Sequence, residues 1–316
     1  MKILTVATRG GALAIAQTRI VIGALKKSYP DLQIEIKKIT TKGDRDRRTV
    51  LWNLKETGFF TSQLEDALLA GQADFAVHSL KDMPTQQRDG LTIAAVCDRQ
   101  FPEDCLISFE KIASIDQLTH AAKTGTSSLR RVAQLKRLRA DLCMTPIRGN
   151  VTTRIKRLEE GRFDAIILAR AGVERLGLSD KISFCFDPSQ FIPAPAQGAL
   201  AVQTRSDDVE TMELVSAIDD KNARTTAFAE RQILTTLQCG CHAPVGAFAE
   251  IAGDEIKICA FISDLEGENF IKLEATGPAT QANQLADKLA GELLSAGGKK
   301  ILSYCHSALD AESKNI

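Results

Sequence analysis

Residues 165–169 read Ala-Ile-Ile-Leu-Ala, a continuous apolar run that directly follows Asp164. A short run of this kind is typical of a strand buried on both faces of a parallel sheet, because helices cover both sides of such a sheet. The preceding residues, 151–160, have a helical pattern that stops at Gly161. This stretch therefore predicts an α/β fold in which helices and strands alternate.

The alternation extends toward the N-terminus. Ser62-x-x-Glu65 is a capping-box pattern, which predicts a helix that opens there and continues through Leu69. Alternating or apolar segments predict strands, and Ala- and Leu-rich periodic segments predict helices. The strands are expected at 3–7, 32–36, 75–80, 91–96 and 142–147, and the further helices at 12–27 and 129–138.

The pattern changes beyond about residue 220. A helix is expected at 223–237, followed by strands at 248–251, 256–262 and 270–275 and a helix at 279–294. A helix, a run of strands and a closing helix indicate a small α+β unit. The residues after Tyr304 are expected to form a flexible tail.

Length, charge and cysteine content limit the classes of function. A chain of 316 residues suggests two or three domains. Lys plus Arg and Asp plus Glu both number 40, so the net charge is zero, which argues against a nucleic-acid partner. No segment approaches the length of a membrane span, and Arg9-Gly10-Gly11 interrupts the apolar part of a signal-like N-terminus. The eight scattered cysteines indicate a reducing compartment, so we expect a cytoplasmic protein without a membrane partner.

Arginines stand where strands are expected to turn into helices. Gly125-Thr126-Ser127-Ser128-Leu129-Arg130-Arg131 is one such junction, 148–154 repeats the arrangement, and Arg9-Gly10-Gly11 follows the first strand. Backbone N–H groups at helix starts favour anions, and guanidinium groups bind carboxylates or phosphates in a bidentate manner. Three such junctions suggest a site for several anionic groups. The alternative is that 130–139 is a solvated helix face or a nucleic-acid patch, and Lys136, Arg137 and Arg139 fit that surface role.

Two further segments carry chemical groups. Asp82 follows the strand at 75–80, where a carboxylate near arginines is a candidate for acid–base work or for stabilising a cation. The alternative is a surface ion pair with Lys81, and His78 on its own fits a packed core histidine. Cys239-Gly240-Cys241-His242 supplies too few ligands for a zinc site, so we expect no metal. Its thiols are structural or serve for covalent attachment.

Taken together, these segments resemble the porphobilinogen deaminase family. The resemblance runs in family order over about residues 3 to 300. The matching segments are 7–9 (Ala-Thr-Arg), 74–84 (Asp-x-Ala-Val-His-Ser-Leu-Lys-Asp-Met-Pro), 125–131, 148–154 (Arg-Gly-Asn-Val-x-Thr-Arg), 164–169, 195–199 (Pro-Ala-Gln-Gly-Ala) and 240–246 (Gly-Cys-x-x-Pro-Val-Gly).

The resemblance implies an architecture and a reaction. It implies two periplasmic-binding-protein-like (type 2) α/β lobes with the active cleft between them, and a small C-terminal α+β domain. The implied boundaries are 1–98 with 196–217, 99–195, 218–303 and a tail at 304–316. The implied activity is that of a transferase, hydroxymethylbilane synthase. It condenses four porphobilinogen molecules head to tail on a covalent dipyrromethane primer, with loss of ammonia, and releases hydroxymethylbilane for heme biosynthesis. We also expect a monomer.

The resemblance also implies a role for individual residues. Asp82 matches the catalytic acid, which binds pyrrole N–H groups and stabilises a cationic azafulvenium, and Cys241 matches the cysteine that holds the dipyrromethane through a thioether. Each pyrrole carries an acetate and a propionate, so the other positions bind carboxylates or add polar contacts. The expected cofactor-binding residues are Ser79, Lys81, Thr126, Ser127, Ser128, Arg130, Arg131 and Arg148, and the expected substrate-binding residues are Arg9, Gln17, Arg148, Gly149, Arg154, Arg175 and Gln197.

The chain departs from the family pattern at three positions. Gly11 stands where the family usually has Ser, and Thr57 stands where the mobile loop usually has Lys. Cys239 replaces a usual Gly and places a second thiol beside Cys241. The rival interpretation is a non-enzymatic two-lobe binding module for a small carboxylate. Such a module would need neither Asp82 nor Cys241, and it would usually carry an export signal or a DNA-binding helix pair.

Overall fold

The computed structural model describes residues 3–41, 61–238 and 243–313. These residues divide into two compact units. The first contains residues 3–41, 61–100 and 197–224, and the second contains residues 101–196, 225–238 and 243–313. The chain thus leaves the first unit and returns to it about a hundred residues later.

The first unit is built on a five-stranded sheet with the order β2-β1-β3-β10-β4. β1, β2 and β3 are parallel, whereas β10 is antiparallel to both of its neighbours. The returning segment therefore supplies an inserted strand, which pairs Val202 with Val77 on one side and with Ala95 on the other. The strands are β1 (Leu4–Arg9), β2 (Ile34–Ile39), β3 (Phe75–Ser79), β4 (Leu91–Cys97) and β10 (Leu200–Arg205).

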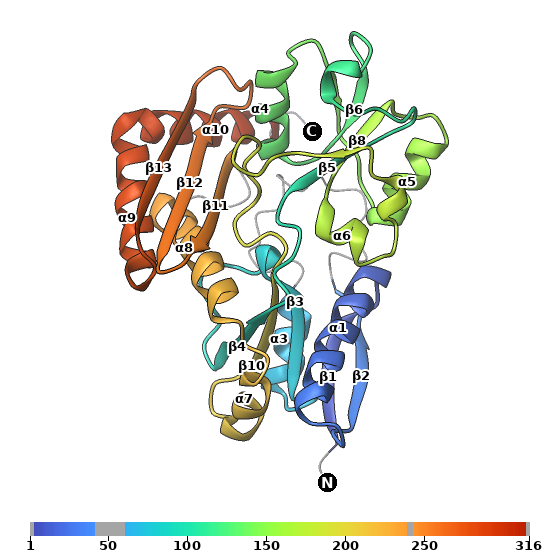
Figure 1. Cartoon of the computed structure of the whole chain (residues 1–316), viewed down its shortest axis with the longest axis vertical. Helices are drawn as coiled ribbons and strands as arrows, with labels where there is room; N and C mark the ends of the chain where they lie inside the picture. Colours follow the sequence, from blue (N-terminus) through green and yellow to red (C-terminus); the bar gives the residue numbers. More distant parts are fainter. Residues whose placement is uncertain (1–2, 42–60, 239–242, 314–316) are drawn as a thin grey trace. The chain divides into compact units, whose positions relative to one another are not determined.

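Helices cover both faces of this sheet, as the sequence predicts for a parallel arrangement. Alternate strand residues point to opposite faces, so Val6 and Val77 join a core with α1, whereas Ala7 and Ala76 join a core with α3. Figure 1 shows α1 alongside β1. The helices are α1 (Ala12–Ser28), α3 (Ser62–Leu69) and α7 (Val209–Ser216).

The helix at Ser62 forms as predicted, but the capping box does not. Thr61 is the N-cap residue, and no side chain caps the helix. Glu65 is buried and accepts a hydrogen bond from Gln203 on β10 at 3.5 Å, so its carboxylate points toward the sheet instead of back to the helix start. The capping-box prediction failed because Glu65 contacts Gln203, which lies 138 residues later in the sequence, instead of the backbone at the start of its own helix.

The second unit contains a sheet with the same plan, in the order β7-β6-β8-β5-β9. β6, β7 and β8 are parallel, and β5 is antiparallel to β8 and β9. Residues 165–169 form β8, and residues 165–168 are buried, as the apolar run predicts. The elements are β5 (Asp104–Ser108), β6 (Lys123–Gly125), α4 (Leu129–Leu138), β7 (Cys143–Thr145), α5 (Val151–Glu159), β8 (Ala165–Ala169), α6 (Arg170–Glu174) and β9 (Phe184–Cys185).

The C-terminal part is an antiparallel three-stranded sheet packed on helices. Figure 1 shows α9 alongside β13. The expected architecture of two α/β lobes with a small C-terminal α+β domain is therefore confirmed, whereas the proposed domain boundaries stay a prediction. The elements are α8 (Lys221–Leu237), β11 (Val245–Ala252), β12 (Glu255–Ser263), β13 (Phe270–Pro278), α9 (Ala282–Leu293) and α10 (Lys299–Ser313).

The end of the chain differs from the flexible tail that the sequence suggests. α10 continues through Ser313. Ile301, Leu302 and Cys305 are buried in the C-terminal core, and Cys305 donates a hydrogen bond to the carbonyl oxygen of Ser263. Spacings of three and four residues place these side chains on one face of the helix, so burial of that face stabilises α10 beyond Tyr304.

Candidate active site

The carboxyl end of β3 presents Asp82 on a short turn. β3 ends at Ser79 and continues into a single 3₁₀ turn, Leu80–Asp82. Leu80 is fully buried, and its backbone N–H donates to the carbonyl oxygen of Ala199 at 3.1 Å. This anchor fixes the turn to the returning segment, and the Asp82 side chain that follows is exposed. A carboxylate that is exposed to solvent on a fixed backbone is well placed to contact a ligand.

Four other predicted residues of the first unit contact one another near this turn. Gln17 on α1 donates from Nε2 to the Ser79 hydroxyl at 2.8 Å. The Lys81 ammonium donates to Oε1 of Gln197 at 3.2 Å, and Gln197 is buried. These contacts join α1, the end of β3 and the segment before β10, which lie up to 116 residues apart. Arg9, a further predicted residue, ends β1.

His78 is a buried neutral residue beneath this group. Burial lowers its pKa from 6.5 to about 4, with a further contribution from the positive charge of Arg9, while a hydrogen bond with Gln203 opposes the shift. A histidine with this pKa carries no charge near neutral pH. The interpretation of His78 as a packed core residue is therefore the one that its burial supports.

Arg130 and Arg131 open α4 in the second unit, and both bind one buried carboxylate. Each guanidinium donates to a separate oxygen of Asp104 at 2.7 Å, and Asp104 is inaccessible to solvent. Arg130 also donates to the carbonyl oxygen of Ile192 at 2.7 Å, and Arg131 to that of Ile167 at 3.0 Å. Nε of Arg131 is buried without a hydrogen-bond partner among the described residues. The two guanidiniums thus share one carboxylate, and one of their donors has no hydrogen-bond partner among the described residues.

Asp104 is the residue that the sequence analysis missed. It begins β5, 26 residues before Arg130, in a segment where no strand was predicted. The sequence signal available was an acidic residue directly before a short apolar run, Cys105-Leu106-Ile107. Such a residue starts many surface strands, so the pattern alone does not indicate a buried partner for arginine.

The hydroxyl residues before α4 have different surroundings. Ser127 donates to the carbonyl oxygen of Ile147 at 2.8 Å and accepts from its N–H at 3.0 Å, so it joins the two arginine-bearing segments. Thr126 is buried, and its hydroxyl accepts from the N–H of Ser128 at 3.3 Å. Ser128 is the N-cap residue, but its side chain makes no capping hydrogen bond, in contrast to the expectation from its type. The first N–H groups of α4 therefore lack a side-chain cap.

The second arginine-bearing segment turns sharply at Gly149. Its φ of +108° is in the region that favours glycine, and a Cβ there would lie 2.8 Å from Cγ2 of Thr153. Asn150 caps α5 by accepting from the N–H of Thr153 at 2.8 Å. Nε of Arg154 donates to the carbonyl oxygen of Gly149 at 2.8 Å, which holds this guanidinium beside the turn.

Positive charge accumulates around Arg154. The pKa of Arg154 is lowered to about 10, mainly by burial and to a smaller extent by the positive charges of Arg131, Arg148 and Arg157. Burial also lowers the pKa of Arg130. A cluster of cations that raise one another's energy is stabilised when an anion arrives. The second unit therefore gathers an excess of positive charge around Arg154.

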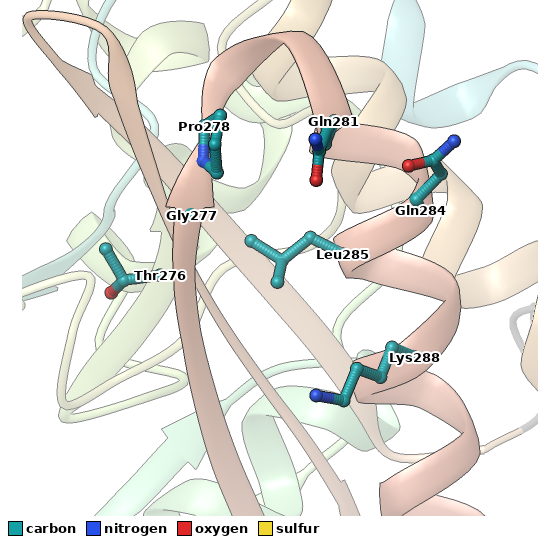
Figure 2. A pocket seen from close by; sticks show the side chains of 7 residues that line it. All are labelled: Thr276, Gly277, Pro278, Gln281, Gln284, Leu285 and Lys288. Carbon is teal, nitrogen blue, oxygen red and sulfur yellow. The ribbon is translucent and has the colours of Figure 1, made fainter.

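The structure contains a pocket separate from these two groups, but its described residues do not meet the requirements of a metal site or a membrane-spanning helix. A pocket of about 300 Å³ lies between β13 and α9, and none of the predicted site residues lines it (Figure 2). The described residues contain no cluster of three His, Cys, Asp or Glu side chains that could hold a metal. No helix among them is both long and apolar enough to cross a membrane.

Sequence comparison decides the family. One family model, described as "Porphobilinogen deaminase, dipyromethane cofactor binding domain", matches residues 4–213, and a second, "Porphobilinogen deaminase, C-terminal domain", matches residues 224–295. The chain belongs to the porphobilinogen deaminase family. Enzymes of this family are transferases, the hydroxymethylbilane synthases, and act on porphobilinogen.

Curated relatives agree with this assignment. The porphobilinogen deaminase of Maridesulfovibrio salexigens is 40% identical over 96% of this chain and 98% of its own length. That of Natranaerobius thermophilus is 42% identical over 95% of this chain and 98% of its own. Among solved structures, a Burkholderia cenocepacia nutrient-binding protein bound to methionine aligns with a TM-score of 0.44 and 14% identity, over 70% of this chain and 93% of that one.

The residues that the family resemblance singles out are distributed over both units. Arg175 is partly buried and follows α6 as its C-cap residue, and Gly11 is the N-cap residue of α1. Cys241, Cys239 and Thr57 lie outside the described residues. The first unit brings together Gln17 with Ser79 and Lys81 with Gln197, and the second brings together Arg131, Arg148 and Arg154. The roles assigned to all of these residues stay predictions.

Proposed function

We propose that this chain condenses porphobilinogen head to tail, with Asp82 as the catalytic carboxylate and the arginines of the second unit as ligands for the carboxylates of the growing chain. The observation that carries the proposal is the grouping of arginines at the turn before α5, where Arg154 donates to the carbonyl oxygen of Gly149 and Arg157 to that of Arg148, each at 2.8 Å. Each added pyrrole brings an acetate and a propionate, so the product becomes steadily more anionic. A preformed excess of positive charge favours such a product.

The donors of the second unit fit a dipyrromethane bearing carboxylates. Arg131 has a buried Nε without a partner among the described residues. Arg148 and Arg154 add two more guanidinium groups, and the positive charges of Arg131 and Arg148 both act on Arg154. Guanidinium–carboxylate hydrogen bonds are among the strongest that proteins make. When bound through Cys241, the dipyrromethane supplies the free pyrrole carbon to which new units are joined. The arginines would hold and orient its side chains.

Asp82 is suited to the charge changes at the reacting pyrrole. A carboxylate accepts hydrogen bonds from pyrrole N–H groups and balances positive charge as ammonia departs. The neighbouring Lys81 directs its ammonium to Gln197, and the Leu80 anchor holds the backbone in place. We infer that Asp82 acts on the reacting ring, while Arg9 and Gln17 bind the carboxylates and polar groups of that ring and Lys81 binds the dipyrromethane.

Three further properties belong to this proposal. Zero net charge supports a protein that does not bind nucleic acid. Scattered cysteines support a cytoplasmic location, where thiols stay reduced. We also propose that the chain acts as a monomer with three domains, at the boundaries implied by the family resemblance.

Substitution of Arg154 tests the proposal, with Arg162 as a matched control. Arg162 is an exposed arginine shortly after the same helix, paired with Glu160. Loss of a charged hydrogen bond to substrate costs about tenfold or more in kcat/KM, so R154Q should show that loss in porphobilinogen turnover. R162Q should stay close to the unmodified enzyme. Equal kinetics for R154Q and the unmodified enzyme would remove the arginine cluster from the binding role.

A further inference from the structure

Two cysteines face each other across neighbouring strands of the second unit. β5 and β9 are antiparallel, and their register places Cys105 opposite Cys185. The N–H of Phe186 donates to the carbonyl oxygen of Asp104 at 2.9 Å, one residue outside the pair on each strand. Cys105 and Cys185 therefore form a non-hydrogen-bonded pair, the kind in which opposing side chains approach most closely.

The geometry of such a pair matches that of a disulfide. Opposite residues point their side chains to the same face of the sheet, and Cα atoms in non-hydrogen-bonded pairs lie about 4.5 Å apart. Disulfides span Cα separations from about 4.4 Å upward. No large backbone movement is needed to join the two sulfurs, both of which are free thiols in the structure.

The two thiols differ in access. Cys105 is inaccessible to solvent, whereas Cys185 is exposed on the edge strand β9. Burial, together with the charges of Asp104 and Cys185, raises the pKa of Cys105 far above its ordinary value. Partial desolvation raises the pKa of Cys185, and the nearby Arg170 lowers it in part. Both thiols are protonated at neutral pH, and this slows their oxidation because the thiolate is the reactive form.

We propose that Cys105 and Cys185 are a thiol–disulfide modification site, at which a small-molecule disulfide reacts first with Cys185 and Cys105 then completes a cross-strand disulfide. The site does not depend on the proposed function. It lies one residue from Asp104, the carboxylate that binds Arg130 and Arg131.

The reaction balances with glutathione disulfide as the oxidant. The Cys185 thiolate attacks one sulfur of glutathione disulfide, which breaks that S–S bond and releases one glutathione thiolate. The Cys105 thiolate then attacks the Cys185 sulfur and releases the second glutathione. Two protons pass from the cysteines to the two glutathiones, and the two electrons lost by the protein thiols reduce the oxidant.

The test uses the purified full-length protein with its cofactor, treated with glutathione disulfide at several pH values. Free thiols are then alkylated, and peptides are analysed by mass spectrometry without reduction. A peptide linked through Cys105 and Cys185 should appear, and it should revert with dithiothreitol. Its formation should accelerate about tenfold per pH unit below the pKa of both thiols, because the thiolate reacts.

Three variants make the result decisive. C105A should keep glutathione on Cys185 as a stable mixed disulfide, because the resolving thiol is absent. C185S should give neither the linkage nor an adduct on buried Cys105, whereas C143S, which removes an exposed thiol on the same sheet, should behave as the unmodified protein. Free thiols at both positions after oxidation, or a linkage of Cys185 to Cys143, would overturn the proposal.

Discussion

Asp104 and Arg131 are joined by a hydrogen bond of 2.7 Å in a place where the carboxylate has no solvent access. The same carboxylate accepts from Arg130, so one negative charge holds two guanidinium groups at the start of α4. Asp104 thus fixes the positions of both arginines, while its single negative charge balances only one of their two positive charges. We expect the remaining positive charge to favour a ligand carboxylate.

Replacement of Asp104 by Asn should destabilise the fold. The amide keeps the shape but leaves two buried guanidiniums without an opposing charge, and breaking a buried ion pair costs about 3–5 kcal/mol. Thermal and urea unfolding of D104N would measure this loss. D66N is the control, because Asp66 pairs with Arg88 at an exposed position and its loss should change Tm little. Equal Tm values for D104N and D66N would contradict the proposed role.

Replacement of Asp82 by Asn should separate binding from catalysis. The variant keeps the size and the turn but loses the negative charge, so it should retain the attached pyrroles and lose turnover by about a hundredfold or more. Porphobilinogen consumption and intact mass would be measured together. D66N is a suitable control, because Asp66 forms an exposed pair with Arg88 in the same unit. If D82N turned over normally, Asp82 would have no catalytic role.

The two thiols at 239 and 241 should differ in cofactor attachment. C241S should lack the covalent pyrroles, because a serine side chain has no sulfur with which to form the thioether, whereas C239S should keep them. Intact mass and reaction with Ehrlich's reagent would distinguish the two. Pyrroles retained in C241S and lost in C239S would assign the attachment to the other sulfur.

His78 should make stability dependent on pH. Its folded pKa of about 4 lies below the ordinary 6.5, so the unfolded chain binds the proton more readily. The free energy of unfolding should then fall as pH decreases from 6.5 toward 4, by up to about 3 kcal/mol from this residue. Urea unfolding of the unmodified protein and H78Q between pH 7 and pH 4.5 would isolate the effect. Parallel pH profiles for both proteins would contradict it.

The sequence predicts the elements whose signals are local. The apolar run at 165–169, the amphipathic helix at 129–138 and the alternating strands after residue 245 all form near the expected positions. Each depends on a pattern of side chains within the element itself, either a continuous apolar run or the period of a helix or strand. The arginine-bearing junctions were located for the same reason, because helix starts leave a local pattern.

The strand pairing and the partners of the site residues depend on contacts between segments that are far apart in the sequence. β10 inserts between β3 and β4, and its pairing is set by residues more than a hundred positions earlier. The partner of Arg130 and Arg131 comes from β5, and Ser127 joins the backbone at Ile147 instead of capping a helix. A single sequence gives the types of these residues but not which of them meet after the chain returns.

Intact-mass measurement of the protein purified from cells that make porphobilinogen tests for the covalent primer and its elongation. The mass should exceed that of the chain by two linked pyrrole units, and further single-unit increments should appear when porphobilinogen is added to the enzyme. An unmodified chain that shows no increments with porphobilinogen would contradict this prediction.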